Sequence, residues 1–387
     1  DFAVRLDLVN DGPMPADSAA VWLWPGFALD SVRTGASMVR PNGADGVSRL
    51  SLPDAVQPQG TAVITYFYHL GAEAVALPAQ WGRFAPDAAY LVFDWLPRTQ
   101  SAVDSSGRVA LVRRARFTLS LDVPGAWRAI APGRMTAEIV SSGRRRTTFA
   151  TEDATAGAPA FALGQYRILT RRAAGLGVAV WLAPDDSVPA AMLDTLVAAV
   201  RSAWIFCSRA YGRLPIADVE VASTRLPETR GFLGFVLSGG LETSRDLLYR
   251  EVARSWWGNS VDAAGPGSWW VREGFPAWTA IAARGALEGD TVRQRLVREA
   301  ESAWHAAVPR TGDAPLASLT SGALAAELLS TKGAAALEAA RRATGESRFR
   351  EAMLSLALEH RNGWVGLQAI LDALGLDAEA VLRSYLF

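Results

Sequence analysis

The chain has 387 residues, with 39 Lys and Arg balanced by 39 Asp and Glu, and half of its residues are hydrophobic. That length predicts two or three domains, and the zero net charge argues against a nucleic-acid-binding protein, which needs a basic face. The single cysteine, Cys207, excludes an internal disulfide framework and a cysteine zinc cluster, and three histidines restrict the available metal and acid–base chemistry. No uninterrupted apolar stretch reaches about 18 residues, so no membrane span is predicted.

Residues 1 to about 165 have the pattern of an all-β domain. Apolar and polar residues alternate in Phe2–Val9, Thr61–His69 and Arg116–Val123, and turn sequences separate such segments. This spacing predicts a sandwich or a saddle-shaped β domain. The basic run Arg144–Arg146 follows Ser-Ser-Gly, and we expect it in a solvated hairpin loop.

After residue 165 the pattern changes. The segments YRILTRR, LGVAVWLA and DVEVAS predict strands, whereas Val188–Tyr211 and nearly everything from Leu241 to Phe387 have a helical period. We therefore predict a two-domain α+β protein. Its N-terminal β domain is expected over residues 1–165, and a mainly helical domain with a small sheet over residues 166–387.

The segment LETSRDLLYREVARSWWGN, Leu241–Asn259, is predicted to form a helix. Thr243 or Ser244 can cap its start, and the glycine of WWGN is expected to end it. Apolar residues four positions apart define its buried stripe, namely Leu248, Val252 and Trp256. Arg250 and Arg254, also four apart, project together beside this stripe.

The sequence REVARSWWGN resembles the zinc helix of the aminopeptidase N family of thermolysin-like zinc metallopeptidases, the gluzincins, which runs close to HEVAHQWWGN. In that motif two histidines bind zinc and the glutamate polarises a water. The third ligand is a glutamate 19 positions after the second histidine, and 273 − 254 = 19 puts Glu273 of WWVREGFPAW there. The resemblance covers essentially the whole chain, and it implies a β domain followed by a thermolysin-like domain.

The sequence departs from this motif at both zinc-binding histidines. Arg250 and Arg254 occupy their positions, and an arginine keeps its proton and has no lone pair to offer a metal. Only Glu251 and Glu273 remain of the catalytic set that the resemblance implies. The three histidines lie outside the motif, so we expect neither zinc nor another cofactor.

Two further landmarks of the family have also changed. Ser330 stands where the YxKG motif has its catalytic tyrosine, although Lys332 and Gly333 of that motif are present. The loop that anchors the free amine of a substrate has its nearest match in Gly231–Gly240, which contains no glutamate. The resemblance therefore implies an active site without its metal, its tyrosine and its amine anchor.

Charge balance suggests what replaces the metal. Two arginines supply the same charge of +2 against Glu251 and Glu273 that Zn²⁺ would supply. We therefore hypothesise that Arg254, with Arg250 as a second candidate, pairs with Glu273 and fills the place of the metal. The alternative is that Asp246–Arg250 and Glu251–Arg254 are ordinary pairs on the surface of one helix.

Tryptophans gather around the same motifs. They are Trp256, Trp257, Trp269, Trp270 and Trp278. Core packing is one explanation for them. The other is a remnant cleft, bordered by the first four and Lys332, that could hold a peptide or a polymer.

These observations predict a catalytically inactive protein with a peptidase fold, acting as a binding or assembly module for an unknown protein or peptide. Two alternatives stay open. Glu251 and Glu273 could perform metal-free acid–base chemistry, with an arginine binding an anionic group, or the chain could be a purely structural subunit of an envelope or transporter complex. The resemblance suggests a bacterial, extracytoplasmic protein, periplasmic or in the cell envelope, and association with a membrane complex is a further expectation.

Overall fold

The computed structural model describes residues 1–10, 13–23, 27–35, 37–39, 47–70, 82–92, 95–99, 114–153, 155–156, 159–173, 175–320 and 323–387. The chain divides into two compact units. One comprises Asp1–Arg83 and Leu91–Arg113, and the other comprises Phe84–Tyr90 and Arg114–Phe387.

The described part of the first 165 residues contains strands and no helix. These strands are β1 (Phe2–Val9), β2 (Ala16–Trp22), β3 (Phe27–Thr34), β4 (Ser37–Val39), β5 (Val47–Val56), β6 (Thr61–Leu70), β7 (Gly82–Phe84), β8 (Ala88–Leu91), β9 (Arg98–Thr99), β10 (Arg114–Ala115), β11 (Thr118–Pro124), β12 (Arg128–Ile130), β13 (Arg134–Ser141), β14 (Arg144–Ala150), β15 (Thr155–Ala156) and β16 (Phe161–Gly164). The β-rich N-terminal region is therefore confirmed.

The first unit contains two antiparallel sheets. Their orders are β1–β6–β3–β4 and β5–β2–β9. Four aromatic rings pack together at one end of the first sheet, because Phe2 stacks on Tyr68 and both contact Phe27, while Phe2 also contacts Trp95. The Tyr68 hydroxyl donates a hydrogen bond to the Trp95 carbonyl, so the polar end of this buried ring is satisfied.

The prediction of a loop at Arg144–Arg146 is wrong. Ser142 and Gly143 form the turn between β13 and β14, with φ angles of 50° and 72°. A turn with two positive φ angles needs only two residues, so the arginines already belong to β14. Arg144 and Arg146 pair with Asp122 of β11, and Arg145 pairs with Glu138 of β13.

The rest of the chain contains a mixed sheet and all the described helices. The further strands are β17 (Arg167–Ala173), β18 (Leu176–Leu182), β19 (Asp218–Ser223), β20 (Arg230–Phe232), β21 (Phe235–Ser238), β22 (Val261–Ala263) and β23 (Gly363–Val365). The helices are α1 (Ala190–Tyr211), α2 (Arg245–Ala253), α3 (Ser268–Glu288), α4 (Asp290–Thr311), α5 (Ala323–Thr344), α6 (Glu346–Glu359), α7 (Leu367–Leu374) and α8 (Leu376–Leu386).

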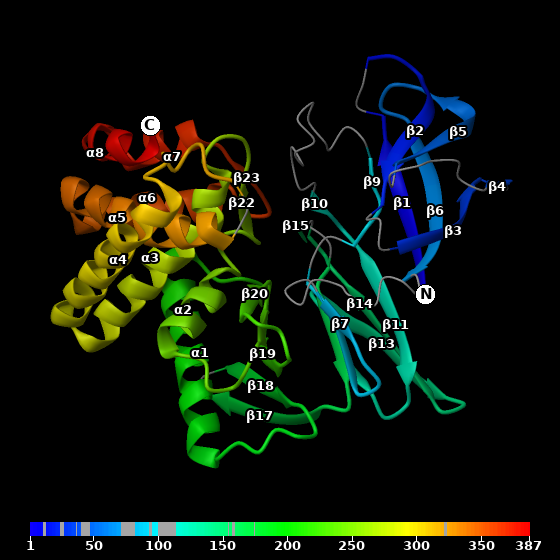
Figure 1. Ribbon diagram of the computed structural model, residues 1–387, viewed down its shortest axis with the longest axis horizontal. Coiled ribbons are helices and arrows are strands. Elements are labelled where there is room, and N and C mark those ends of the chain that lie inside the picture. The colour runs from blue at the N-terminus through cyan, green and yellow to red at the C-terminus, as the bar shows by residue number, and fades with distance from the viewer. Residues whose placement is uncertain are drawn as a thin grey trace. The chain divides into compact units, whose positions relative to one another are not determined.

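Helices begin only after residue 165, as the sequence predicts, but the boundary of the compact units falls elsewhere. The segment Arg114–Gly164 lies in the same unit as the helices. The domain boundary at residue 165 therefore stays a prediction. The two-domain fold class, a β-rich N-terminal region followed by a mainly helical region, is confirmed (Figure 1).

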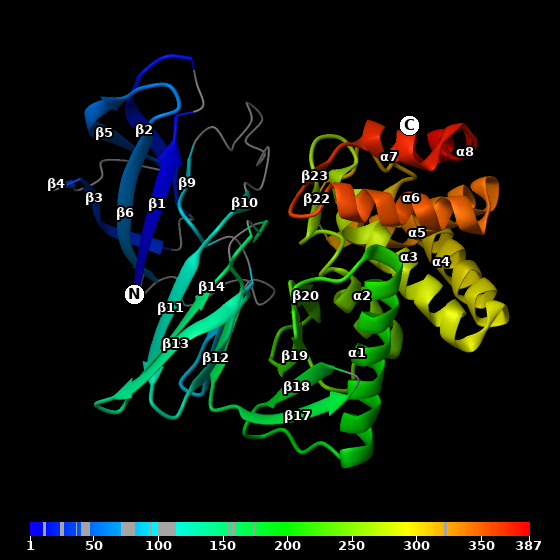
Figure 2. The ribbon, with the colours of Figure 1, turned by 180° about the vertical axis from the view of Figure 1, so that it is seen from behind.

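The five-stranded sheet has the order β17–β18–β19–β21–β20. β18 and β19 run parallel, and parallel neighbours need a crossover, which α1 provides. Figures 1 and 2 show α1 lying along this sheet. Val178 and Val180 of β18 and Val200 of α1 belong to the same buried core, with at most 1% of each residue exposed.

By length and composition alone, α1 is long and apolar enough to cross a membrane, although no such segment is predicted from an uninterrupted apolar stretch. The helix contains Asp194, Arg201 and Arg209, which is why it does not appear as an uninterrupted apolar stretch. One face of α1 is buried against the sheet in the core, as expected of a core helix in a folded domain.

Helices α3 and α5 cross with their backbones almost in contact. A methyl group added at Gly333 would lie 3.0 Å from Gly274 Cα and 2.7 Å from Trp270 Cδ1. The Trp270 indole N–H donates a hydrogen bond of 3.1 Å to the Gly333 carbonyl. Gly274 follows Glu273 and Gly333 follows Lys332 in the two family motifs. The close crossing of the helices explains why both positions are glycine.

We expect Gly333→Ala to lower the free energy of unfolding by about 1–3 kcal/mol, because overpacking at the crossing outweighs the helix-propensity gain of about 1 kcal/mol. Urea denaturation measures this difference. Gly366→Ala is the control, since an added Cβ there meets nothing within 4 Å and φ is −89°. An equal effect of the two substitutions would contradict the packing argument.

Candidate functional site

The candidate site lies where α2 packs against α3 and β20. Ser244 caps α2, its hydroxyl accepting a hydrogen bond from the Leu247 N–H, as predicted. The helix ends at Ala253, five residues before the expected stop at Gly258. The side-chain amide of Asn259 donates a hydrogen bond of 2.8 Å to the Arg254 carbonyl, so this carbonyl at the end of the helix has a partner.

Glu251 is the buried centre of the site, with 1% of its side chain exposed. Its Oε1 accepts a hydrogen bond of 2.9 Å from Arg250 Nε. Its Oε2 accepts two, at 2.7 Å from Arg254 Nε and at 2.8 Å from the backbone N–H of Gly231 in β20. The carboxylate therefore joins both arginines of α2 to the edge strand.

Arg254 joins the two glutamates. Besides its bond to Glu251, its Nη2 donates to Glu273 Oε2 at 2.7 Å, and its Nη1 donates to Glu273 Oε1 at 3.2 Å. The expected Arg254–Glu273 pair is thus present as a two-point contact between a guanidinium and a carboxylate. Only 18% of the Arg254 side chain and 15% of the Glu273 side chain are exposed.

Arg250, the second candidate for Glu273, pairs with Glu251 instead. Its side chain is 32% exposed and makes its contact along the rim of the cluster. The alternative pair Asp246–Arg250 is not formed either, because Asp246 pairs with Arg284 of α3. The other alternative, Glu251–Arg254, is present, but it is one edge of the buried network and not an isolated surface pair.

Two contacts of the network are not predicted by the sequence motifs. Arg254 Nη1 also donates to the Arg272 carbonyl at 2.7 Å. Four residues later α3 contains Pro276, which has no N–H to offer this carbonyl, so it is free to accept the arginine. A proline inside a predicted helix was the available sequence signal.

Arg272 itself forms a second buried ion pair. Its Nε and Nη2 donate to the two carboxylate oxygens of Asp262 at 2.7 and 2.9 Å, and its guanidinium lies 4.9 Å from the centre of a Trp269 ring. Asp262 is fully buried and also accepts the N–H of Ala263. With this pair, three arginines balance three carboxylates around the site.

The electrostatics fix the charge states. Burial raises the pKa of Glu251, but attraction to Arg254 and Arg250 and the Gly231 hydrogen bond outweigh it, so its pKa lies below the ordinary value. Burial likewise opposes the charge of Arg254, but Glu251 and Glu273 raise its pKa above that of a free arginine. Glu251 and Arg254 are therefore both ionised at neutral pH.

The residues present do not fit a zinc ion. Arg250 and Arg254 have no lone pair to donate, and the carboxylate oxygens of Glu251 and Glu273 all accept hydrogen bonds from arginines or backbone. In the described part of the chain, no group of three or more His, Cys, Asp or Glu residues is arranged to hold a metal.

Ser330 and Lys332 make contacts away from this network. The Ser330 hydroxyl donates to the carbonyl of Glu327 within α5. Lys332 Nζ donates to Asp313 Oδ1 at 2.8 Å and to the Ala314 carbonyl at 3.0 Å, and only 4% of its side chain is exposed. Lys332 thus holds the segment after α4, and its Nζ lies 5.4 Å from the centre of the ring of Trp304, which is not one of the clustered tryptophans.

The clustered tryptophans are packed in the core. Their exposed fractions are 1% for Trp256, 0% for Trp257 and Trp270, and 5% for Trp278. Trp256 contacts Trp204 of α1, while Trp257 and Trp270 both contact Phe275. Trp269 is half-buried beneath Arg272. This packing favours the explanation that the tryptophans are core residues. The remnant cleft stays a prediction, without support from these side chains.

No protein-family model matches the sequence, and no curated protein matches it significantly. Solved structures do match. A mutant M1 zinc metallopeptidase from Deinococcus radiodurans aligns with 100% of this chain and 89% of its own at 18% identity and a TM-score of 0.77. The M1 zinc metallopeptidase from Deinococcus radiodurans with no mutation named aligns with 99% of this chain and 88% of its own, at 19% identity and a TM-score of 0.76.

A third structure, the mutant bound to a Tyr-Ser-Ala substrate, aligns with 99% of this chain and 89% of its own at 18% identity and 0.76. At such identities the likeness establishes the fold. The chain has the two-domain fold of the M1 zinc metallopeptidases, the aminopeptidase N family that its motifs resemble.

Proposed function

We propose that this chain is a catalytically inactive protein with an aminopeptidase fold that acts as a binding or assembly module. The observation that carries the proposal is the Arg254 guanidinium, which bridges Glu251 and Glu273. These are the two carboxylates that the resemblance assigns to general base and metal ligand. A fixed positive charge between them supports the fold in the role of a metal, without a metal's capacity to activate water.

The expected result is that the purified chain contains no stoichiometric zinc and shows no chelator-sensitive hydrolysis of aminoacyl p-nitroanilides. Zinc is measured by mass spectrometry of the metal content after dialysis against zinc. The matched variant is Arg250→His/Arg254→His, which restores the ligand pattern and should bind zinc if the backbone is preserved. Stoichiometric zinc in the unaltered chain, with hydrolysis that a chelator abolishes, would refute the proposal.

The metal-free hydrolase is the weaker alternative. A general base needs a free lone pair and a pKa near the working pH, whereas Glu251 is buried, fully hydrogen-bonded and lowered in pKa. Glu251→Gln distinguishes a metal-free hydrolase from an inactive module, since any hydrolysis that depends on this carboxylate must vanish in the variant.

What the module binds is proposed on the resemblance alone. Our hypothesis is an extracytoplasmic, bacterial envelope protein that binds a protein or peptide partner. The alternative hypothesis is a purely structural subunit of an envelope or transporter complex. Affinity purification of the tagged chain from native membranes and from soluble extract, followed by mass spectrometry, distinguishes a stable complex from transient peptide binding.

A further inference from the structure

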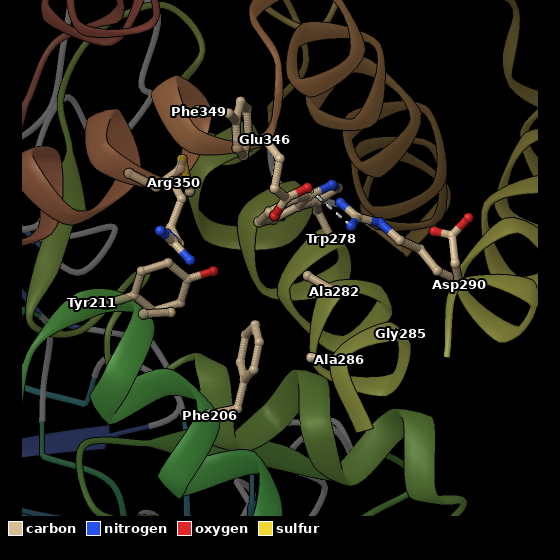
Figure 3. Close-up of a pocket in the computed structure, with 13 residues that line it drawn as sticks. Phe206, Tyr211, Trp278, Ala282, Gly285, Ala286, Asp290, Glu346, Phe349 and Arg350 are labelled. Carbon is tan, nitrogen blue, oxygen red and sulfur yellow. Dashed lines mark hydrogen bonds and ion pairs between the residues drawn. The ribbon is translucent and has the colours of Figure 1, made fainter. Parts of the chain in front are cut away.

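A cavity of about 270 Å³ lies between α1, α3, α4 and α6 (Figure 3). Ala282 of α3 borders it, and 282 − 273 = 9 residues separate this alanine from Glu273. At 100° per residue, nine residues correspond to two and a half turns, so Ala282 lies on the opposite face of α3 from Glu273 and the arginine–glutamate network. It is therefore a separate site.

Aromatic rings form the walls of the cavity. They are Phe206 and Tyr211 from α1, Trp278 from α3 and Phe349 from α6. Figure 3 shows the Phe206 ring and the Tyr211 ring pointing into the space. Ala282, Gly285 and Ala286, on one stripe of α3, leave room between these rings. An added Cβ at Gly285 would lie 2.7 Å from Arg293 Cβ, so glycine lets the start of α4 approach.

The carboxylates at the cavity already have partners. Glu346 accepts from Arg293 at 3.3 Å and from Arg341 at 2.8 Å. Asp290 is the first residue of α4, where a carboxylate favours the helix dipole, and it accepts from Gln294 at 2.6 Å. Two arginines thus neutralise Glu346, whereas Asp290 keeps its charge at the exposed start of α4.

The cationic groups, by contrast, retain unused donors. Arg293 pairs with Glu338 and Glu346 through its terminal nitrogens, but its Nε is buried without a hydrogen-bond partner in the described structure. Arg350 borders the cavity and forms no ion pair with any described residue, although Glu346 lies one helical turn before it. Figure 3 shows its guanidinium pointing toward the Tyr211 side of the cavity.

We propose that this cavity binds a small aromatic molecule with one carboxylate group. The ring lies among Phe206, Tyr211 and Trp278, and the carboxylate contacts the guanidinium of Arg350. A volume of about 270 Å³ corresponds to about nine water molecules in liquid, which suits one ring with a short acid chain. The aromatic lining supplies stacking and edge contacts, and the arginine supplies charge-assisted hydrogen bonds.

The test uses three probes of the same shape and different charge: phenylacetate, phenylacetamide and phenethylamine. Binding to the full chain is measured by calorimetry and by saturation-transfer NMR up to about 20 mM, the range expected for ligands of this size. We expect phenylacetate to bind at least about tenfold more tightly than the amide, and the amine to bind no better than the amide. No binding of phenylacetate, or equal binding of all three, overturns the proposal.

Arg350→Gln should weaken phenylacetate binding about tenfold and leave the amide unchanged. The matched control is Arg348→Gln, which removes the same charge from an exposed position of α6 that does not line the cavity. Both arginines are exposed, and they differ in that Arg350 alone lines the cavity. We expect the control to stay within about twofold of the unaltered chain, since a charge that does not touch the ligand is screened by salt. An equal loss in both variants would mean a general charge effect and would refute a specific contact.

Filling the cavity provides a second, independent test. Ala282→Leu adds volume to the buried wall, and Ala286→Leu adds it at an exposed position of the same stripe, where unfolding is not expected. Thermal denaturation checks that each variant is folded. A folded variant that still binds phenylacetate with unchanged affinity would place the ligand elsewhere and overturn the assignment.

Discussion

Replacing Arg254 with alanine is expected to lower the free energy of unfolding by about 3–5 kcal/mol, the range found when one partner of a buried ion pair is removed. The substitution leaves Glu251 and Glu273 buried without their shared counter-charge, and it removes the donor to the Arg272 carbonyl. Urea denaturation at neutral pH, followed by circular dichroism, measures the difference.

The matched control is Arg250→Ala. Arg250 donates one hydrogen bond to Glu251 from a side chain that is 32% exposed, so Glu251 keeps Arg254 and Gly231 when it is lost. We expect this control to cost about 1 kcal/mol. A loss of the same size for both variants would show that Arg254 is not the centre of the network.

The effect of Arg254→Ala should depend on pH in a defined direction. In the unaltered chain the pKa of Glu251 is lowered, so its contribution to stability is present above its unfolded pKa and is lost as the pH falls through the lower folded pKa. In the variant, the largest attraction that lowers the pKa of this carboxyl is lost, so its pKa rises relative to that in the unaltered chain. Its ionisation then contributes less to folding, so the stability gap between variant and unaltered chain should narrow as the solution is acidified.

The substitution Gly231→Ala is expected to destabilise the chain by about 3 kcal/mol or more, or to prevent folding. A Cβ at this position would lie 1.8 Å from the Glu251 carbonyl oxygen and 2.6 Å from its carbon, both backbone atoms of α2. Overpacking against backbone cannot be relieved by a rotamer change. The strand must move away, and the hydrogen bond from Gly231 N–H to Glu251 Oε2 is then lost.

Gly240→Ala is the control for this second prediction. Gly240 lies in the loop that follows the same hairpin, and an added Cβ there meets nothing within 4 Å. We expect it to change the free energy of unfolding by less than about 0.5 kcal/mol. Thermal denaturation of the two variants measures the contrast. Comparable stability would contradict the close approach of β20 to α2.

Local pattern predicted the elements well. The alternation in Phe2–Val9 corresponds to β1 over the same residues, and the helical period after Val188 corresponds to α1 over Ala190–Tyr211. The ends of the helices and strands were harder to predict. The helix with the zinc-like motif stops before Gly258, whose N–H donates to the Val261 carbonyl, while Asn259 donates to the Arg254 carbonyl. Hydrophobic periodicity does not encode these contacts.

For the candidate site, the spacing between the motif positions predicted the central contact. The 19-residue spacing brought Arg254 to Glu273, because the fold preserves the geometry in which the motif's ligands converge. Spacing could not decide which carboxylate Arg250 would take, since a long flexible side chain at a rim reaches several partners. The role of Pro276 in freeing a carbonyl depends on which side chain lies opposite, and only the packing of α2 on α3 shows this.

The crossing at Gly274 and Gly333 has a mechanical consequence. Helix pairs that shear past one another do so through a layer of side chains that change rotamer, and here no such layer separates the two backbones. Sliding of α3 past α5 therefore requires the two backbones to separate first, which favours joint movement of the helices. The ion pairs between Arg254 and Glu273 fasten α2 to the same block. We therefore expect α2, α3 and α5 to move as one unit.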